Sequence, residues 1–195
     1  MKLRTKKIKR LLTGFEMHEM EREVCTNPDL YNLRGKSLNE LKALALEYKL
    51  EIITSDKRGT RIALLPPQNI SDDYNGRIQL RWPPSRFDIM HELLHYILDV
   101  GIGNVVTDAC YEDYSPHRES SDPNERKINY MAAALLMPFD EMEIAIQAFD
   151  EKQSSAFTQQ FISDLEDQYD VNGNCVVTRI QEVRKQMHMR KQGMI

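Results

Sequence analysis

Cysteine and long apolar runs are both scarce in this 195-residue sequence. The three cysteines, Cys25, Cys110 and Cys175, are far apart and form no C-x-x-C pair, so no disulfide framework is expected. A reduced, cytoplasmic setting is the simplest fit. Since no apolar run reaches 18 residues, no transmembrane helix is expected, and the basic segment Met1–Arg10 lacks the apolar stretch that would follow it in a signal peptide.

The modest net charge of −4 conceals an uneven distribution along the chain. Residues 1–10 hold six basic and no acidic side chains, and residues 179–195 hold five basic and one acidic, which leaves residues 11–178 with a net charge of −14. An acidic body repels the phosphate backbone of DNA and therefore argues against direct nucleic-acid binding. It suits a basic protein partner, although a merely solvated acidic surface explains the charge equally well.

One pentapeptide carries the strongest chemical signal, namely the H-E-x-x-H motif from His91 to His95. Positions i and i+4 share a helix face, so both imidazoles can reach one metal ion, and Glu92 lies on a neighbouring face. This arrangement is typical of zinc hydrolases in which the glutamate takes a proton from water. The alternative is a pair of core histidines bonded to backbone carbonyls. The apolar composition of Phe87–Val100 predicts one buried helix. Because polar side chains in such a helix are costly unless a partner satisfies them, this composition favours a metal site over a pair of core histidines.

The remaining pattern predicts a mainly helical α+β fold. Ser37 and Glu40 form a capping box before an amphipathic helix, and Asp122 with Pro123 begins another helix that ends at Pro138. Between them, three short strands are expected over Leu50–Thr54, Thr60–Leu65 and Arg77–Arg81, and an irregular segment over Asn104–Ser121. Three further helical stretches follow over Asp140–Phe149, Ala156–Tyr169 and Cys175–Met189.

A catalytic zinc needs a third protein ligand, and no third histidine follows the motif at the spacing of a metzincin. Glu125 is a candidate because it lies in the first turn of a helix whose run of alanines permits close packing against the histidine helix. It could equally be the N3 capping residue for Asp122. Glu119 and Asp122 are the nearest alternative ligands.

Two segments resemble the signature of ImmA/IrrE-type metallopeptidases. Arg86–His95 is similar to the R-x-x-F/R-F-T-x-A-H-E-L-G-H segment, and Glu125–Pro138 to E-x-x-A-N-x-F-A-A-x-L-L-M-P. The resemblance covers roughly residues 38–138. Similarity to the helix-turn-helix-like ending of the family is found at Leu165–Tyr169, Val171 and Val176–Ile180. This sequence departs from the motifs in places. Among the departures are four positions where Thr, Gly, Ala and Phe are usual in the family: Asp88, Leu94, Ile128 and Met131. Leu94 thereby adds volume beside the expected metal site.

The resemblance implies a minimal, gluzincin-type zincin fold that binds Zn²⁺ through His91, His95 and Glu125, with Glu92 as general base. Asn129 is either a hydrogen-bond partner of a ligand or a helix-packing amide. Tyr111, Tyr114 and His117 are unassigned candidates for the oxyanion donor. The expected division is a basic helical segment (1–36), the metallopeptidase domain (37–150) and a helix-turn-helix-like extension (151–195).

The substrates implied by the resemblance are helix-turn-helix repressors of phages, mobile elements or stress regulons. Two alternatives stay open. A zincin scaffold could antagonise a repressor by holding it without cutting it. A DNA-binding regulator could instead contact phosphates through basic residues near the C-terminus, namely Arg179, Arg184, Lys185, Arg190 and Lys191.

Overall fold

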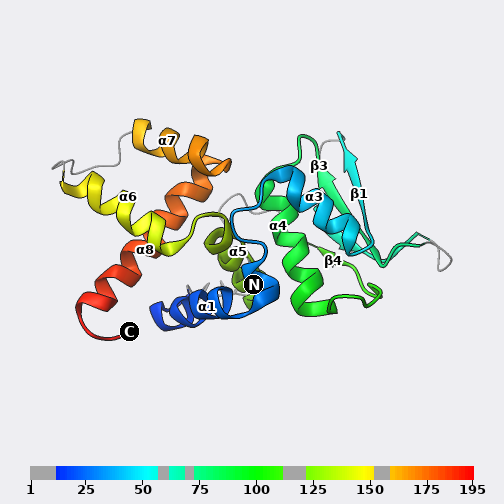
Figure 1. Cartoon of the computed structure of the whole chain (residues 1–195), viewed down its shortest axis with the longest axis horizontal. Coiled ribbons are helices and arrows are strands. Elements are labelled where there is room, and N and C mark those ends of the chain that lie inside the picture. The colour runs from blue at the N-terminus through cyan, green and yellow to red at the C-terminus, as the bar shows by residue number, and fades with distance from the viewer. Residues whose placement is uncertain (1–11, 57–61, 69–72, 112–121, 152–158) are drawn as a thin grey trace, which may run out of the picture.

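The computed structural model describes residues 12–56, 62–68, 73–111, 122–151 and 159–195. Along the chain the elements are α1 (Gly14–Thr26), α2 (Pro28–Tyr31), α3 (Leu38–Glu47), β1 (Leu50–Ser55), β2 (Ala63–Leu65), β3 (Gly76–Arg81), α4 (Arg86–His95), η1 (Tyr96–Val100), β4 (Cys110–Tyr111), α5 (Pro123–Leu136), α6 (Phe139–Glu151), α7 (Gln159–Tyr169) and α8 (Gly173–Lys191). Figure 1 shows a small sheet at one end of the molecule, α6, α7 and α8 at the other end, and α1, α4 and α5 between them.

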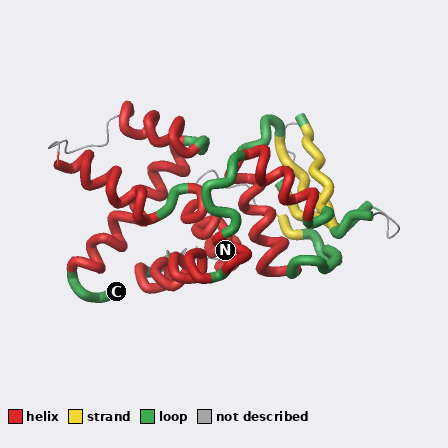
Figure 2. The backbone as a smooth tube through the Cα atoms, viewed as in Figure 1, coloured by secondary structure: helices red, strands yellow, loops and turns green. Residues whose placement is uncertain are grey.

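The mixed sheet has the strand order β1-β3-β2-β4, with β1 parallel to β3 and the other pairs antiparallel. The three predicted strands are present, which confirms the α+β class, and Figure 2 shows how small a part of the molecule they form. Two-residue β4 pairs with β2 inside the segment expected to be irregular. Part of that segment therefore extends the sheet, because β2 offers a free edge for pairing.

Local sequence explains where the helices begin. The side chains of Thr13 and Ser37 each accept a hydrogen bond from the backbone N–H of a glutamate three residues later. The side chain of that glutamate accepts in turn from the backbone N–H of the capping residue. These capping boxes satisfy backbone groups that the first helical turn leaves open. The helix predicted to run from Phe87 to Val100 is continuous, but its last turn is a π-helix, in which Gly101 N donates to Tyr96 O at 2.8 Å.

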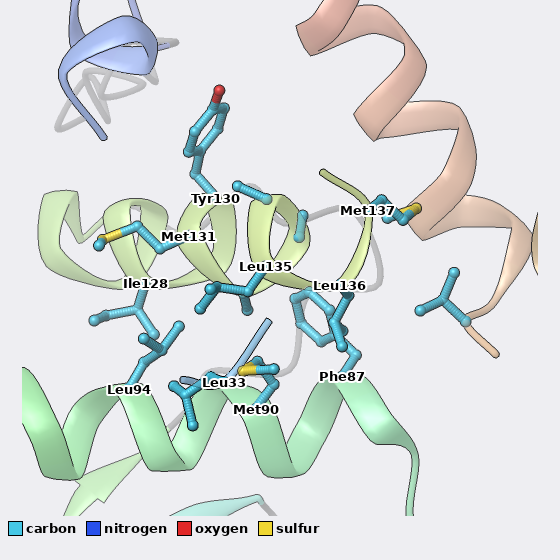
Figure 3. Packing of buried hydrophobic residues seen from close by; sticks show 14 of the residues in the cluster. Leu33, Phe87, Met90, Leu94, Ile128, Tyr130, Met131, Leu135, Leu136 and Met137 are labelled. Carbon is cyan, nitrogen blue, oxygen red and sulfur yellow. The ribbon is translucent and has the colours of Figure 1, made fainter. Parts of the chain in front are cut away.

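The hydrophobic core is concentrated between α4 and α5. Figure 3 shows Leu94 facing Ile128 and Phe87 facing Leu136 across this interface, and all four side chains are buried. Ala132, Ala133 and Ala134 are buried as well, as expected for a helix that approaches its neighbours closely. Tyr130 points away from α4, so α5 is covered on more than one side.

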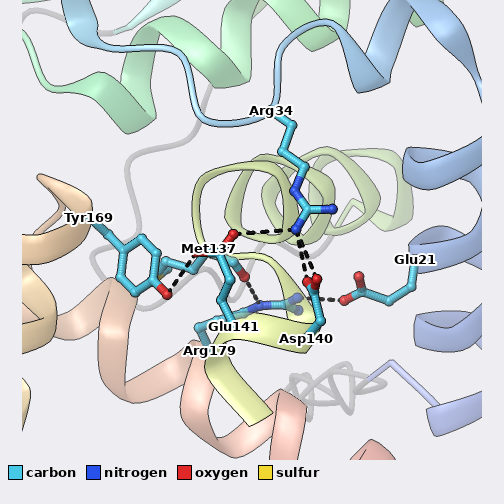
Figure 4. Close-up of polar contacts among 7 residues, drawn as sticks. All are labelled: Glu21, Arg34, Met137, Asp140, Glu141, Tyr169 and Arg179. Carbon is cyan, nitrogen blue, oxygen red and sulfur yellow. Dashed lines mark hydrogen bonds and ion pairs between the residues drawn. The ribbon is translucent and has the colours of Figure 1, made fainter. Parts of the chain in front are cut away.

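The terminal helices α1 and α8 pack against α5 through a buried polar network. Arg179 of α8 is completely buried and donates to Glu21 of α1 (2.5 Å) and to the carbonyl of Met137 (3.0 Å). Tyr130 of α5 donates to the same Glu21 oxygen at 2.8 Å. Figure 4 shows Arg179 between Met137 and Glu21, and nearby Arg34 joins Asp140 and Glu141 of α6. These contacts argue against the alternative in which Arg179 contacts phosphate, since this guanidinium neutralises an internal carboxylate.

Other basic side chains near the C-terminus also make internal contacts. Arg184 pairs with Asp150, and Lys185 donates to the carbonyl of Leu12 at 2.7 Å. Arg190 lies over the ring of Phe139, 4.0 Å from its centroid.

The division of the chain at residues 36 and 150 stays a prediction. No helix in the described part of the chain is long and apolar enough to cross a bilayer.

Replacing Arg179 by Met tests the buried network. The variant leaves the Glu21 carboxylate buried without its cationic partner, so the free energy of unfolding should fall by about 3–5 kcal/mol in urea titrations followed by circular dichroism. Arg184→Met is the matched control on the same helix. Because its ion pair is exposed, it should lose less than about 1 kcal/mol. Equal losses in the two variants would contradict a special role for Arg179.

Candidate metal centre

The helix that carries the histidines begins at a capping box. The Ser85 hydroxyl accepts from Asp88 N at 3.1 Å, and the Asp88 carboxylate accepts from Ser85 N at 3.3 Å. Asp88 stands where the family motif commonly has Thr, and the structure gives it this capping role. Arg86 further holds the start of α4 by donating to the carbonyls of Lys36 and Tyr169, both at 2.6 Å.

The two histidines of the motif point to one place. His91 and His95 are 0% and 2% exposed, and their Nε2 atoms lie 3.0 Å apart. Both rings lie one helical turn apart on the same face of α4, as the i, i+4 spacing predicts. The interpretation as separate core histidines bonded to carbonyls is therefore wrong, since each ring turns its Nε2 toward the other.

Glu125 completes the cluster from α5. One carboxylate oxygen lies 3.3 Å from His91 Nε2 and the other lies 3.2 Å from His95 Nε2. The N-cap Asp122 accepts from Asn124 N at 2.8 Å, so the start of α5 is capped without Glu125. Within the described residues, the ligand atoms of His91, His95 and Glu125 lie within 4.8 Å of one another and could hold a metal ion.

Oxygen acceptors behind the histidines orient both rings. His91 Nδ1 lies 3.1 Å from Asn129 Oδ1, and His95 Nδ1 lies 2.7 Å from Asp99 Oδ2. Because an amide oxygen and a carboxylate only accept, each Nδ1 carries the proton and each Nε2 presents a lone pair. Asn129 thus contacts a histidine of the cluster, as expected of a residue that supports a ligand.

The charges around the cluster favour a cation. Burial alone would lower the pKa of His95, but the carboxylates of Glu125, Glu92 and Asp99 outweigh burial and raise this pKa to about 9. Burial would likewise raise the pKa of Glu125, yet hydrogen bonds to His91 and His95 and their positive charge lower it to about 2. At neutral pH, His95 is therefore protonated in the metal-free protein, so that the two Nε2 atoms do not face each other with lone pairs alone. A metal ion can replace this proton.

The donor spacing fits a zinc ion. Zinc binds imidazole nitrogen and carboxylate oxygen at about 2.0–2.2 Å in tetrahedral geometry, which places neighbouring ligand atoms about 3.3–3.6 Å apart. The two Nε2 atoms lie 3.0 Å apart, and each lies 3.2–3.3 Å from a different oxygen of the Glu125 carboxylate, which approaches this range. Two neutral nitrogens and one carboxylate also form the donor set of catalytic zinc sites that leave a fourth position for water or substrate.

Leu94 lies beside the histidines but faces the helix interface. At 100° per residue, Leu94 and Glu92 flank the shared histidine face of α4 on opposite sides. Leu94 is fully buried against Ile128, another residue larger than its counterpart in the family motif. The two larger side chains thus fill the α4–α5 contact together.

Glu92 is 1% exposed on the other side of the histidine face, and its charge is one of the causes that raise the pKa of His95.

Asp99 and Asn124 were missed by sequence reasoning. Asp99 was detectable from its i, i+4 spacing to His95, whereas Asn124 reaches Asp99 only through the packing of α5 (3.0 Å). Glu119, Tyr114, His117 and the side chain of Tyr111 lie outside the described part of the structure.

Comparison with known proteins agrees with this geometry. Residues 79–171 match the model of the IrrE N-terminal-like domain, a peptidase family. No curated protein matches the chain. The match begins within β3, ends just after α7, and contains α4, α5 and all three converging donors. Residues 79–171 thus match an IrrE N-terminal-like domain, which confirms the resemblance to ImmA/IrrE-type metallopeptidases.

Proposed function

We propose that the protein is a zinc-dependent endopeptidase that hydrolyses a peptide bond in a helix-turn-helix transcriptional repressor and so relieves repression of a phage, mobile element or stress regulon. The convergence of His91, His95 and Glu125 in a buried cluster between α4 and α5 is the observation that carries the proposal. The peptidase family of the matched domain supports the reaction class.

The roles of the side chains follow from their positions. His91, His95 and Glu125 would hold the zinc ion, and Asn129 would fix the ring of His91. A zinc ion held there supplies Lewis acidity, which makes water a stronger nucleophile and polarises a peptide carbonyl. Glu92 would accept the proton of the attacking water and pass it to the leaving amine nitrogen. Its burial beside the histidines keeps this proton transfer away from bulk solvent.

The substrate class rests on the family resemblance and on charge. The net charge of −14 over residues 11–178 favours association with a basic protein, and DNA-binding repressors are basic on the surface that meets phosphate. The acidic body would then steer the repressor toward the enzyme. This attraction should weaken as salt concentration rises.

Zinc binding by the three donors can be tested through thermal stability. A free zinc concentration a hundredfold above Kd should stabilise the wild-type protein by about 2.7 kcal/mol, or roughly 5–10 °C in Tm relative to a chelator-treated sample. Glu125→Ala should lose most of this shift, because the third ligand is gone. Glu47→Ala, which removes an exposed glutamate from α3, should keep it. A full shift in Glu125→Ala would place the third ligand elsewhere.

The general base can be tested separately from metal binding. Glu92→Gln keeps the shape of the side chain but cannot accept the proton, so it should retain one zinc per chain and lose at least about a hundredfold of the cleavage rate. The measurement is gel electrophoresis of a co-expressed repressor together with metal analysis of the purified variant. Cleavage at the wild-type rate would refute the mechanism. A repressor that is bound but stays full length with the wild-type protein would support the non-proteolytic antagonist instead.

A further inference from the structure

The carboxylate of Asp99 connects both helices of the metal centre. Its Oδ2 accepts from His95 Nδ1 at 2.7 Å and from Asn124 Nδ2 at 3.0 Å. Asp99 lies in η1, one turn after His95, whereas Asn124 lies in the first turn of α5, directly before Glu125. A single oxygen atom thus joins the end of the histidine helix to the start of the helix that carries the third donor.

The two histidines differ in what holds them. His91 donates to Asn129, which comes from the buried middle of α5 and is 3% exposed. His95 donates to Asp99, whose side chain is 31% exposed, and Asn124 is exposed as well. The imidazole of His91 is therefore fixed by the core, while the imidazole of His95 depends on a contact at the rim of the cluster.

We propose that Asp99 and Asn124 are a pair of positioning residues for the metal centre: Asp99 fixes the ring of His95, and Asn124 holds Asp99 and the first turn of α5 together, so that His95 Nε2 faces the Glu125 carboxylate. This inference rests on the proposed binding of zinc by His95 and Glu125. Neither positioning residue touches the metal or the substrate in this account.

Asp99, which accepts from His95, lies in the π-helical turn η1. This turn ends where Gly101 N reaches back five residues to the carbonyl of Tyr96, and π-helical turns are often found at functional sites. Without the Asp99 carboxylate, the ring of His95 could rotate about its side-chain bonds, because no other described contact to its Nδ1 is present. A rotated ring no longer offers Nε2 to Glu125, so affinity for metal falls while the core stays packed.

Zinc affinity of the full-length variants, measured by competition with a chromophoric chelator, tests the proposal. Asp99→Ala should weaken binding by about 10–100-fold, the usual effect of losing a group that orients a ligand. Asp99→Asn should weaken it less, because an amide oxygen can still accept from His95 as Asn129 does from His91. Asn124→Ala should have a smaller effect, and adding it to Asp99→Ala should cause no further loss, since Asn124 acts through Asp99.

Two further measurements separate positioning from general loosening. Asn104→Ala is the matched control, because Asn104 Nδ2 donates to the carbonyl of Val100 at the end of the same turn. It should leave zinc affinity unchanged. The visible absorption spectrum of the Co²⁺-substituted protein reports ligand geometry, and it should change in Asp99→Ala and match the wild type in Asn104→Ala.

The outcomes distinguish this proposal from the one it rests on. A wild-type protein that binds no zinc, or a Glu125→Ala variant that binds it normally, would remove the proposed function and the positioning pair together. Tight binding by the wild type with equal affinity and an equal cobalt spectrum in Asp99→Ala would overturn the positioning pair alone. Additive losses from Asp99→Ala and Asn124→Ala would overturn the coupling between them.

Discussion

The metal centre depends on one contact that needs a cation: the Nε2 atoms of His91 and His95 lie 3.0 Å apart in a buried interface, where two neutral rings would face each other with their lone pairs. The acceptors behind the rings force this arrangement, because Asn129 and Asp99 take the Nδ1 protons of His91 and His95. Glu125 then adds negative charge on the side that both Nε2 atoms face. A site built this way favours a cation over an empty state, which explains why such polar side chains occupy the core.

Burying these polar side chains is unfavourable, and the packing of α5 against its neighbouring helices offsets this unfavourable free energy. On the side toward α4, α5 contributes Glu125 and Asn129 to the cluster and Ile128 to the apolar contact with Leu94. In another direction, Tyr130 joins α5 to α1 and α8 through Glu21 and Gln186. The terminal helices therefore help to fix the helix that carries the third donor. In this protein, the C-terminal helix α8 supports the interior through Arg179.

The residues of the metal cluster were candidates from the sequence, whereas several contacts that support them were not predictable. The shared face of His91 and His95 follows from helical spacing alone, and Glu125 was a candidate because its alanine-rich helix can pack closely against the histidine helix. The π-helical turn and β4 depend on tertiary contacts, which sequence periodicity does not encode. Burial of Arg179 was missed for a related reason, because its partner Glu21 lies 158 residues away. Asn124 could not be linked to Asp99 before α4 and α5 were placed side by side.

X-ray absorption at the zinc edge of the zinc-loaded protein tests the central claim most directly. The account predicts a first coordination shell of nitrogen and oxygen at about 2.0–2.2 Å, with the scattering pattern of two imidazoles and no sulfur. A sulfur ligand at about 2.3 Å, from a cysteine such as Cys25 or Cys175, or a shell with fewer than two imidazoles would contradict it.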